Sequence, residues 1–71
     1  SFGRADAAMV FSDDCALADA MATALGNRIQ SARDIQPSID WGKSVKGIRG
    51  IVIILSDHIG VWGEQMELVS L

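Results

Sequence analysis

Two polar side chains, Asp19 and Thr23, lie in a stretch from Cys15 to Gly26 whose other side chains are small or apolar. On an α-helix, residues four apart lie on one face with their Cβ atoms about 5–6 Å apart. A carboxylate and a hydroxyl would then point the same way from an apolar helix. A carboxylate in apolar surroundings is costly unless it is paired, hydrogen-bonded or bound to a cation, so Asp19 is expected to have a partner.

Carboxylate and hydroxyl oxygens are hard ligands of the kind that Mg²⁺ and Ca²⁺ accept, with a backbone carbonyl, water or phosphate in the remaining positions. Two side chains do not complete a metal site. The spacing alone therefore leaves three interpretations open. The pair has a metal or ligand role, or Asp19 is a buried carboxylate satisfied by protein groups, or this face of the helix is in contact with water.

The helix that carries the pair is predicted to run over residues 14–33, although Gly26-Asn27 could end or weaken it. Ser12 or Asp13 can cap its first amides. Asp13 and Asp14 also complement the positive end of the helix dipole, which makes capping their expected role and metal ligation the lesser alternative.

One face of this helix carries an apolar stripe, while Asp19, Thr23 and Gln30 lie together on the other side. The stripe consists of Leu17, Met21, Leu25, Ile29 and Ala32. Alanines and Gly26 fill the flanks. Because a helix that is small or apolar nearly all round is usually buried, we expect this one to be buried, with Cys15 as an inert core thiol.

The remaining elements are predicted from local patterns. Their expected ranges are a buried strand at 7–11, a short helix within 34–45 with Pro37 in its first turn, a turn at 46–50, a strand buried on both faces at 51–55, a hairpin tip at 56–58, a returning strand at 59–63, and a strand or coil at 64–71. This order of elements predicts an α/β fold of the α+β type in one unit.

The chain is short for its hydrophobicity, with 71 residues, 49% of them apolar, a mean hydropathy of +0.27 and a net charge of -3. Below roughly 70–80 residues one core seldom supplies more than about 3–5 kcal/mol, and a single cysteine excludes an intramolecular disulfide. We therefore expect residues 1–71 to be an incomplete unit, the C-terminal portion of a larger domain or a processing product, lying against a partner that covers part of its apolar surface.

Composition also excludes several classes of protein. No run approaches the roughly 20 apolar residues needed to span a bilayer, and the first residues lack the pattern of a secretory signal. Nine acidic residues against six basic ones, with no basic run, are not expected of a nucleic-acid binder. The lone cysteine suits a reducing compartment, so we expect a cytoplasmic protein.

Residues 10–25 resemble a segment of the ApbE family of flavin transferases. They read Val-Phe-Ser-Asp-Asp-Cys-Ala-Leu-Ala-Asp-Ala-Met-Ala-Thr-Ala-Leu. In that family a strand leads through a short polar link into an Ala-Asp-Ala-x-(Ser/Ala)-Thr-Ala helix. The hairpin from Gly50 to Gly63, with its Gly-Val-Trp-Gly-Glu ending, looks more like a small uncharacterised branch of the same superfamily. The resemblance covers most of this chain but only the C-terminal part of a family member.

The resemblance implies a magnesium-dependent enzyme that binds FAD, cleaves its pyrophosphate and moves FMN onto a hydroxyl of a target protein. Carried over by residue, the metal ligands would be Asp19, Thr23 and the carbonyl of Ala22, with a further carbonyl from an earlier segment. Mg²⁺, or Ca²⁺ as the alternative, and FAD are thus the cofactors expected from the resemblance. In transferases the catalytic histidine lies in a His-x-x-x-Pro-x-Thr-Gly stretch before the motif, so we expect this chain alone to be inactive.

Two kinds of partner follow from these interpretations. As part of an ApbE-like protein, the chain would associate with the N-terminal part of its parent, with FAD and with a target protein; a homo-oligomer is an alternative. A second hypothesis is a non-catalytic fragment whose helix and hairpin form an obligate interface. Asp19 would then be satisfied by the partner's backbone or by an arginine.

Other reactive residue types have simpler structural explanations. We expect His58 to be a solvated hairpin residue rather than an acid or base, and Trp41 and Trp62 to be core or interface aromatics. Arg4, beside Asp6, would form a surface ion pair, with a phosphate or flavin contact as the alternative. Ser1 in place of a starting methionine could result from self-cleavage, but proteolysis is the simpler explanation.

Overall fold

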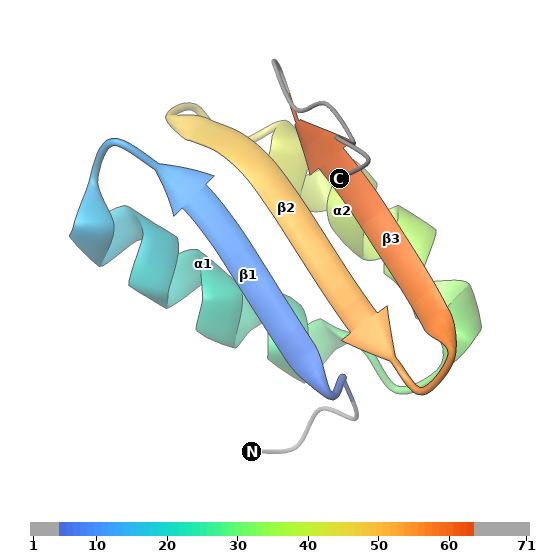
Figure 1. Cartoon of the computed structure of the whole chain (residues 1–71). Coiled ribbons are helices and arrows are strands. Elements are labelled where there is room, and N and C mark those ends of the chain that lie inside the picture. The colour runs from blue at the N-terminus through green and yellow to red at the C-terminus, as the bar shows by residue number, and fades with distance from the viewer. Residues whose placement is uncertain (1–4, 64–71) are drawn as a thin grey trace, which may run out of the picture.

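The computed structural model describes residues 5–63, whose elements follow the expected order. They are strand β1 (Ala7–Ser12), helix α1 (Cys15–Arg28), the 3-10 turn η1 (Ala32–Asp34), helix α2 (Ile35–Lys43), strand β2 (Ile48–Leu55) and strand β3 (His58–Gly63). The three strands form one antiparallel sheet with β2 in the middle (Figure 1). This confirms the α+β fold class.

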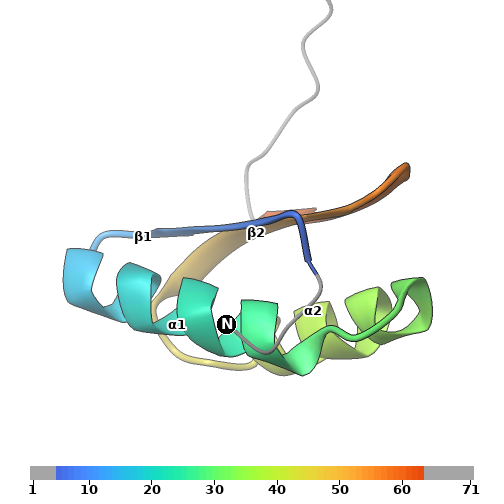
Figure 2. The same cartoon turned by 90° about the horizontal axis from the view of Figure 1, so that it is seen from below.

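Both helices pack on the same face of the sheet, so the molecule has a helix layer and a sheet layer (Figure 2). The core lies between them. Its buried hydrophobic residues are Met21, Leu25, Ile29, Ile35, Ile39, Ile48, Ile51 and Ile53. Within α1 the predicted apolar stripe is confirmed at Leu17, Met21 and Leu25. Its other two members, Ile29 and Ala32, also join or contact the core but lie beyond the end of the helix.

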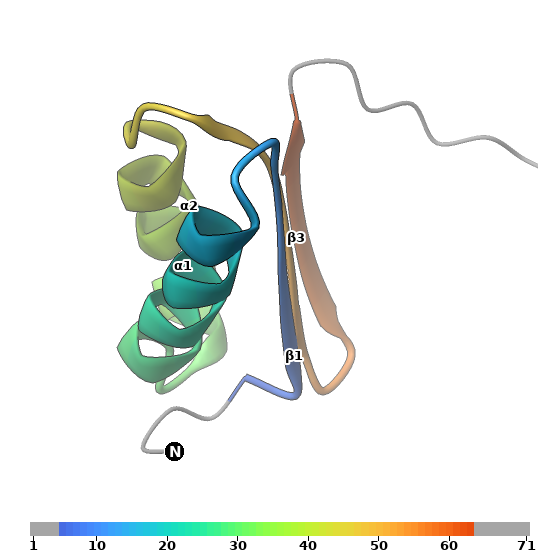
Figure 3. The ribbon, with the colours of Figure 1, turned by 90° about the vertical axis from the view of Figure 1, so that its left-hand side faces the viewer.

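Two burial predictions are wrong because the helices cover only one face of the sheet (Figure 3). The strand predicted as buried at 7–11 is an edge strand with Met9 and Phe11 nearly half exposed, at 47% and 48%. The strand at 51–55 is not buried on both faces either. Ile51 and Ile53 are fully buried, whereas Val52, which points to the other side, is only partly buried.

The predicted turn at 46–50 is too long, because β2 already begins at Ile48. Gly47 makes the turn into the strand with a φ of 98°, a left-handed conformation that glycine adopts without steric cost. The predicted hairpin tip is also one residue too long. Only Ser56 and Asp57 form it, and His58 already pairs with Leu55.

Helix α1 ends at Arg28 instead of continuing to residue 33, because the next residues have other hydrogen-bond partners. Ile29 is extended, with φ -98° and ψ 113°. The carboxylate of Asp34 accepts the amides of Gln30 at 2.9 Å and Ser31 at 3.0 Å. The weak point foreseen at Gly26-Asn27 therefore lies within the last turn of α1, directly before the break.

The sequence predicts that the first helix is buried on all sides, but α1 is buried on one side only. Only Met21 and Leu25 are buried within it, and Cys15 is exposed. Cys15 lies two positions before Leu17, a rotation of about 200° away from the apolar stripe. The prediction of a core thiol is therefore wrong, because small size does not by itself place a side chain on the packed face.

The second helix is confirmed, with Pro37 in its first turn and Ile35 and Ile39 buried. Both isoleucines lie where a Cβ on Gly60 of β3 would be, so α2 and β3 approach closely at this glycine. Trp41 and Trp62 are partly buried against the core, as expected. The guanidinium of Arg28 lies 4.2 Å from the centroid of the Trp41 ring, a cation–π contact that joins α1 to α2.

Several sequence predictions fall outside the described residues. These are the roles of Ser1 and Arg4 and the structure of residues 64–71. Within residues 5–63, neither helix has the length and hydrophobicity that a membrane span requires.

We expect Gly60→Ala to destabilise the protein by about 1–3 kcal/mol, because the new methyl group would overlap Ile35 and Ile39 in a packed core. Gly26→Ala is the matched control, since a Cβ there meets nothing within 4 Å. It should stabilise the protein by about 0.5–1 kcal/mol through helix propensity. Urea unfolding of both variants measures the difference; equal stabilities would contradict the close approach of α2 and β3.

The stability contributed by Asp34 should depend on pH. The hydrogen bonds from the amides of Gln30 and Ser31 lower the pKa of this carboxyl below its ordinary value. Its contribution is therefore fully present above the pKa of the unfolded chain and is lost as the pH falls through the lowered pKa of the folded protein.

Asp34→Asn should accordingly lower the melting temperature at neutral pH, and the difference from wild type should vanish in acid. Asp19→Asn is the control, because the Asp19 carboxylate has no protein partner among the described residues. Melting curves over a pH series provide the measurement. A difference for Asp34→Asn that persists unchanged in acid would show that the charge is not involved.

Candidate functional site

Asp19 and Thr23 are both exposed on α1, one turn apart. The Thr23 Oγ1 donates a hydrogen bond to the backbone carbonyl of Asp19 at 3.3 Å, so the lone pairs of this hydroxyl are not used by that contact. No residue in the described part of the chain hydrogen-bonds or pairs with the Asp19 carboxylate. The interpretation of Asp19 as a buried, internally satisfied aspartate is therefore wrong for this chain.

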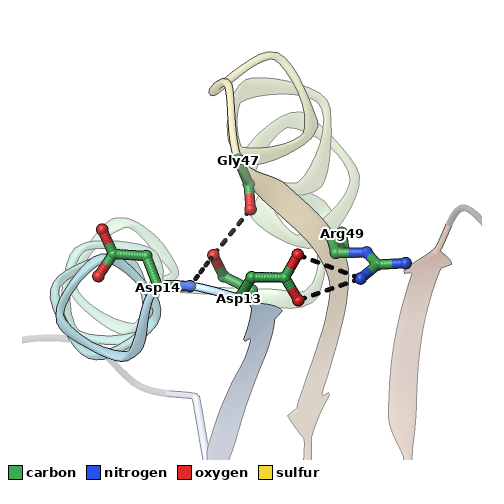
Figure 4. Close-up of polar contacts among 5 residues, drawn as sticks. Asp13, Asp14, Gly47 and Arg49 are labelled. Carbon is green, nitrogen blue, oxygen red and sulfur yellow. Dashed lines mark hydrogen bonds and ion pairs between the residues drawn. The ribbon is translucent and has the colours of Figure 1, made fainter.

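The N-terminus of the helix that carries the pair is fixed by Asp14 and Ser12. The Asp14 carboxylate caps the helix by accepting the amide of Leu17 at 3.1 Å. The Ser12 hydroxyl accepts the amide of Asp14 at 3.1 Å and donates to the carbonyl of Gly47 at 2.8 Å (Figure 4). The prediction that Ser12 or Asp13 caps the helix is therefore wrong, because the cap is Asp14. Ser12 instead connects the start of α1 to the turn before β2.

Asp13 forms an ion pair with Arg49, with an oxygen–nitrogen distance of 3.1 Å (Figure 4). The register between β1 and β2 shifts at this point, since Phe11 pairs with Gly50 and Ser12 with Ile48. Arg49 is therefore left without a partner in the ladder, and such a bulge turns a side chain out of its regular direction. The contact of Asp13 is thus an ion pair with Arg49, and the cap of α1 is Asp14.

An open depression lies between α1 and the start of β1. Its lining includes Ala22, Thr23 and Asn27 from the helix, and Asp6 and Ala8 from the other side. Two of the three predicted metal positions thus line this depression, whereas Asp19 lies outside it. The small side chains foreseen on the helix flanks leave the room for it.

Sequence reasoning missed Asn27 as a neighbour of the pair, although it lies four residues after Thr23 and the same helical spacing could have found it. The expected ion pair of Asp6 with Arg4 involves a residue outside the described part of the chain. Within that part, the Asp6 carboxylate accepts the amide of Ser56, at 2.6 Å, and so connects the start of β1 to the hairpin tip. This contact joins residues 50 positions apart, and no local pattern predicts it.

Two further candidates also lie on the surface. Cys15 borders a second shallow hollow together with Arg49 and Asp13. His58 is exposed, with its Nε2 3.6 Å from an oxygen of Asp57. The expectation that His58 is a solvated residue beside the hairpin tip is confirmed, and its contacts do not assign it an acid or base role.

The residues of the pair fit a hard divalent cation in their chemistry. Asp19 supplies an unpaired carboxylate and Thr23 a hydroxyl, oxygens of the type that Mg²⁺ and Ca²⁺ prefer. The Ala22 carbonyl belongs to the hydrogen-bond ladder of α1 and has a second lone pair. Within residues 5–63 no three or more His, Cys, Asp or Glu side chains gather in one place, so the pair can supply only part of a coordination shell.

Comparison with known proteins identifies similar sequences. The model of the family described as AbpE bacteria matches residues 1–61. A UPF0280 protein of Methanosarcina acetivorans is 48% identical over 96% of this chain and 27% of its own length. For the UPF0280 proteins of Methanosarcina barkeri and Methanocaldococcus jannaschii, the identities are 48% and 38%, over 90% and 99% of this chain and 26% and 30% of theirs. No solved structure matches the chain at a significant level.

Asp14→Ala should destabilise the protein by about 0.5–2 kcal/mol, because it removes the side chain that caps α1. Asp13→Ala is a neighbouring control that also removes one carboxylate. It breaks only an exposed ion pair with Arg49 and should cost less than about 0.5 kcal/mol. Denaturant unfolding of the two variants measures both effects, and a larger loss for Asp13→Ala would contradict the assignment of the cap.

Proposed function

Because the chain belongs to the AbpE bacteria family, we propose that it supplies part of a Mg²⁺-dependent FAD-binding site in an ApbE-related protein. One observation carries the proposal. The Asp19 carboxylate is exposed on α1, one turn from the Thr23 hydroxyl, and has no protein partner within the described residues. The resemblance of this helix to the ApbE motif indicates which ion would bind, because in that motif the same two residue types hold Mg²⁺.

Each residue has a distinct role in this proposal. Asp19 provides the negative charge that attracts the cation, and Thr23 provides a neutral oxygen. The Thr23 hydroxyl donates its proton to the carbonyl of Asp19, which directs its lone pairs away from that bond. The Ala22 carbonyl is the third proposed ligand. When bound, Mg²⁺ would stabilise negative charge on the phosphates of FAD, which is the chemistry that pyrophosphate cleavage requires.

The depression beside Thr23 supports a ligand on this side of α1. Alanines and Gly26 line most of it, so a bound group can come close to the helix backbone. Its polar lining comes from Thr23 and Asn27 on one side and from Asp6 on the other. We place the cation near Thr23 and Asp19, and leave the depression for groups attached to the phosphates.

The rest of the site is proposed to come from outside these residues. The chain spans 26% to 30% of the length of the three relatives described above. A flavin pocket, the additional carbonyl ligand and any catalytic histidine would therefore belong to the longer protein. Transfer of FMN from FAD to a hydroxyl of a target protein is the reaction that the resemblance to flavin transferases suggests for it.

The alternative function is a non-catalytic fragment that forms an obligate interface. It is favoured by four large apolar side chains that are exposed in the described structure, Met9, Phe11, Ile59 and Val61. All four come from strands and none from α1, so such an interface would not occupy the helix face that carries Asp19. The exposed apolar residues thus support the hairpin part of this interface. The other part of the alternative, in which a partner satisfies Asp19, competes with the metal site and is decided by what the Asp19 carboxylate binds in the full-length protein.

Asp19→Asn in the full-length protein should weaken Mg²⁺-dependent FAD binding by at least about tenfold, because a direct ligand loses its charge. Thr23→Val should weaken it as well, since it removes the hydroxyl oxygen and leaves the shape unchanged. Calorimetric titration of FAD, in Mg²⁺ and then in chelator, measures both effects.

Asp57→Asn is the matched control, a carboxylate at the hairpin tip that takes no part in the proposed site, and it should bind FAD like wild type. Circular dichroism verifies that all three variants are folded. If Asp19→Asn binds FAD with unchanged affinity and unchanged dependence on Mg²⁺, the assignment of the site is wrong.

A further inference from the structure

The sheet has a second face, opposite the helices, on which three cross-strand rows consist entirely of apolar residues. Cross-strand partners share a face, and the register arranges this one in three rows. The rows are Ala7, Ile54 and Ile59, then Met9, Val52 and Val61, then Phe11, Gly50 and Gly63. Neither α1 nor α2 covers this face (Figures 2 and 3).

Exposure shows that this face is open along the two outer strands, β1 and β3. Ile59 is 66% exposed, and Met9, Phe11 and Val61 are each close to half exposed. An antiparallel sheet that meets water on one side normally alternates apolar and polar residues along each strand. Here both faces are apolar, which is the pattern of a middle layer. Soluble monomers rarely expose a continuous apolar patch of this kind.

The shape of the face limits what can cover it. At one end of this face Phe11 on β1 lies beside Gly50 on β2 and Gly63 on β3. The surface there has one large side chain at the edge strand and no side chains on the two neighbouring strands. At the other end Ile54 and Ile59 stand beside Ala7. A layer that packs closely must therefore place large side chains over the glycines and small ones over Phe11 and Ile59.

We propose that this sheet face, defined by its three rows, is covered in the full-length protein by an apolar layer from the same polypeptide. The relatives match nearly all of this chain but are matched over only 26% to 30% of their own length. They therefore contain much additional polypeptide that can form a third layer, as sheets covered on both faces require. The proposal does not depend on the metal site.

A second copy of the chain is the competing occupant. A layer in the same polypeptide faces the sheet at an effective concentration of about 1 mM, and it is present whenever the protein is present. A second copy must bind from dilute solution and lose translational freedom on binding. The covering layer within one polypeptide is therefore favoured over a dimer.

The test measures the reactivity of introduced thiols in the full-length protein. Met9→Cys and Val61→Cys place one thiol each on the middle row, in a background in which Cys15 and any other cysteine are replaced by serine. Lys46→Cys, in the exposed turn before β2, is the matched control. Covered positions should react with a charged thiol reagent at least about tenfold more slowly than Lys46→Cys.

Protection should be independent of protein concentration between about 1 and 100 µM, because an intramolecular layer needs no partner. Sedimentation over the same range reports the oligomeric state, and circular dichroism verifies folding. Protection that appears only as dimers form would overturn the proposal in favour of a second copy. Thiols at both positions that react as fast as Lys46→Cys in the folded protein would show an open face and also overturn it.

Discussion

The described structure depends on packing two helices against one face of a small sheet. Leu25 and Ile29 from one side and Ile51 and Ile53 from the other are the largest fully buried side chains. Burying each contributes about 1.5–3 kcal/mol relative to leaving it in water. This contact sets the rotation of α1 about its axis. Once its apolar stripe faces the sheet, Asp19 and Thr23 lie on the exposed side of the helix.

A second constraint acts at the end of the sheet where α1 begins. Ser12 connects the amide of Asp14 to the carbonyl of Gly47, and so joins two chain reversals that are far apart in sequence. The bulge at Arg49 lies at the same corner and explains why this side chain reaches Asp13. The helix that carries the proposed ligands therefore starts from a corner held by side-chain hydrogen bonds to the backbone.

The two surfaces of greatest functional interest lie in different layers. The Asp19–Thr23 pair is on α1, in the helix layer, and the apolar rows are on the face of the sheet that the helices leave open. The metal ligand set that we propose is incomplete and the sheet is covered on one face, so both proposals assign the missing part to a longer protein. This assignment agrees with the comparisons, since the chain spans only 26% to 30% of the length of the three relatives.

The order of elements, the apolar stripe of α1 and the Asp19–Thr23 pair could all be predicted from the sequence, because they rest on periodicity and spacing within one element. Burial could not. An apolar run such as 51–55 has the same composition whether one face or both are covered, and small residues such as Cys15 pack or stay exposed according to the rotation of the helix. The end of α1 depends on both levels, since Ile29 packs into the core, which is a tertiary contact, and Asp34 accepts the next two amides, which is a local one. Local sequence determines which face of an element is apolar, whereas only the assembled layers determine which of those faces are covered.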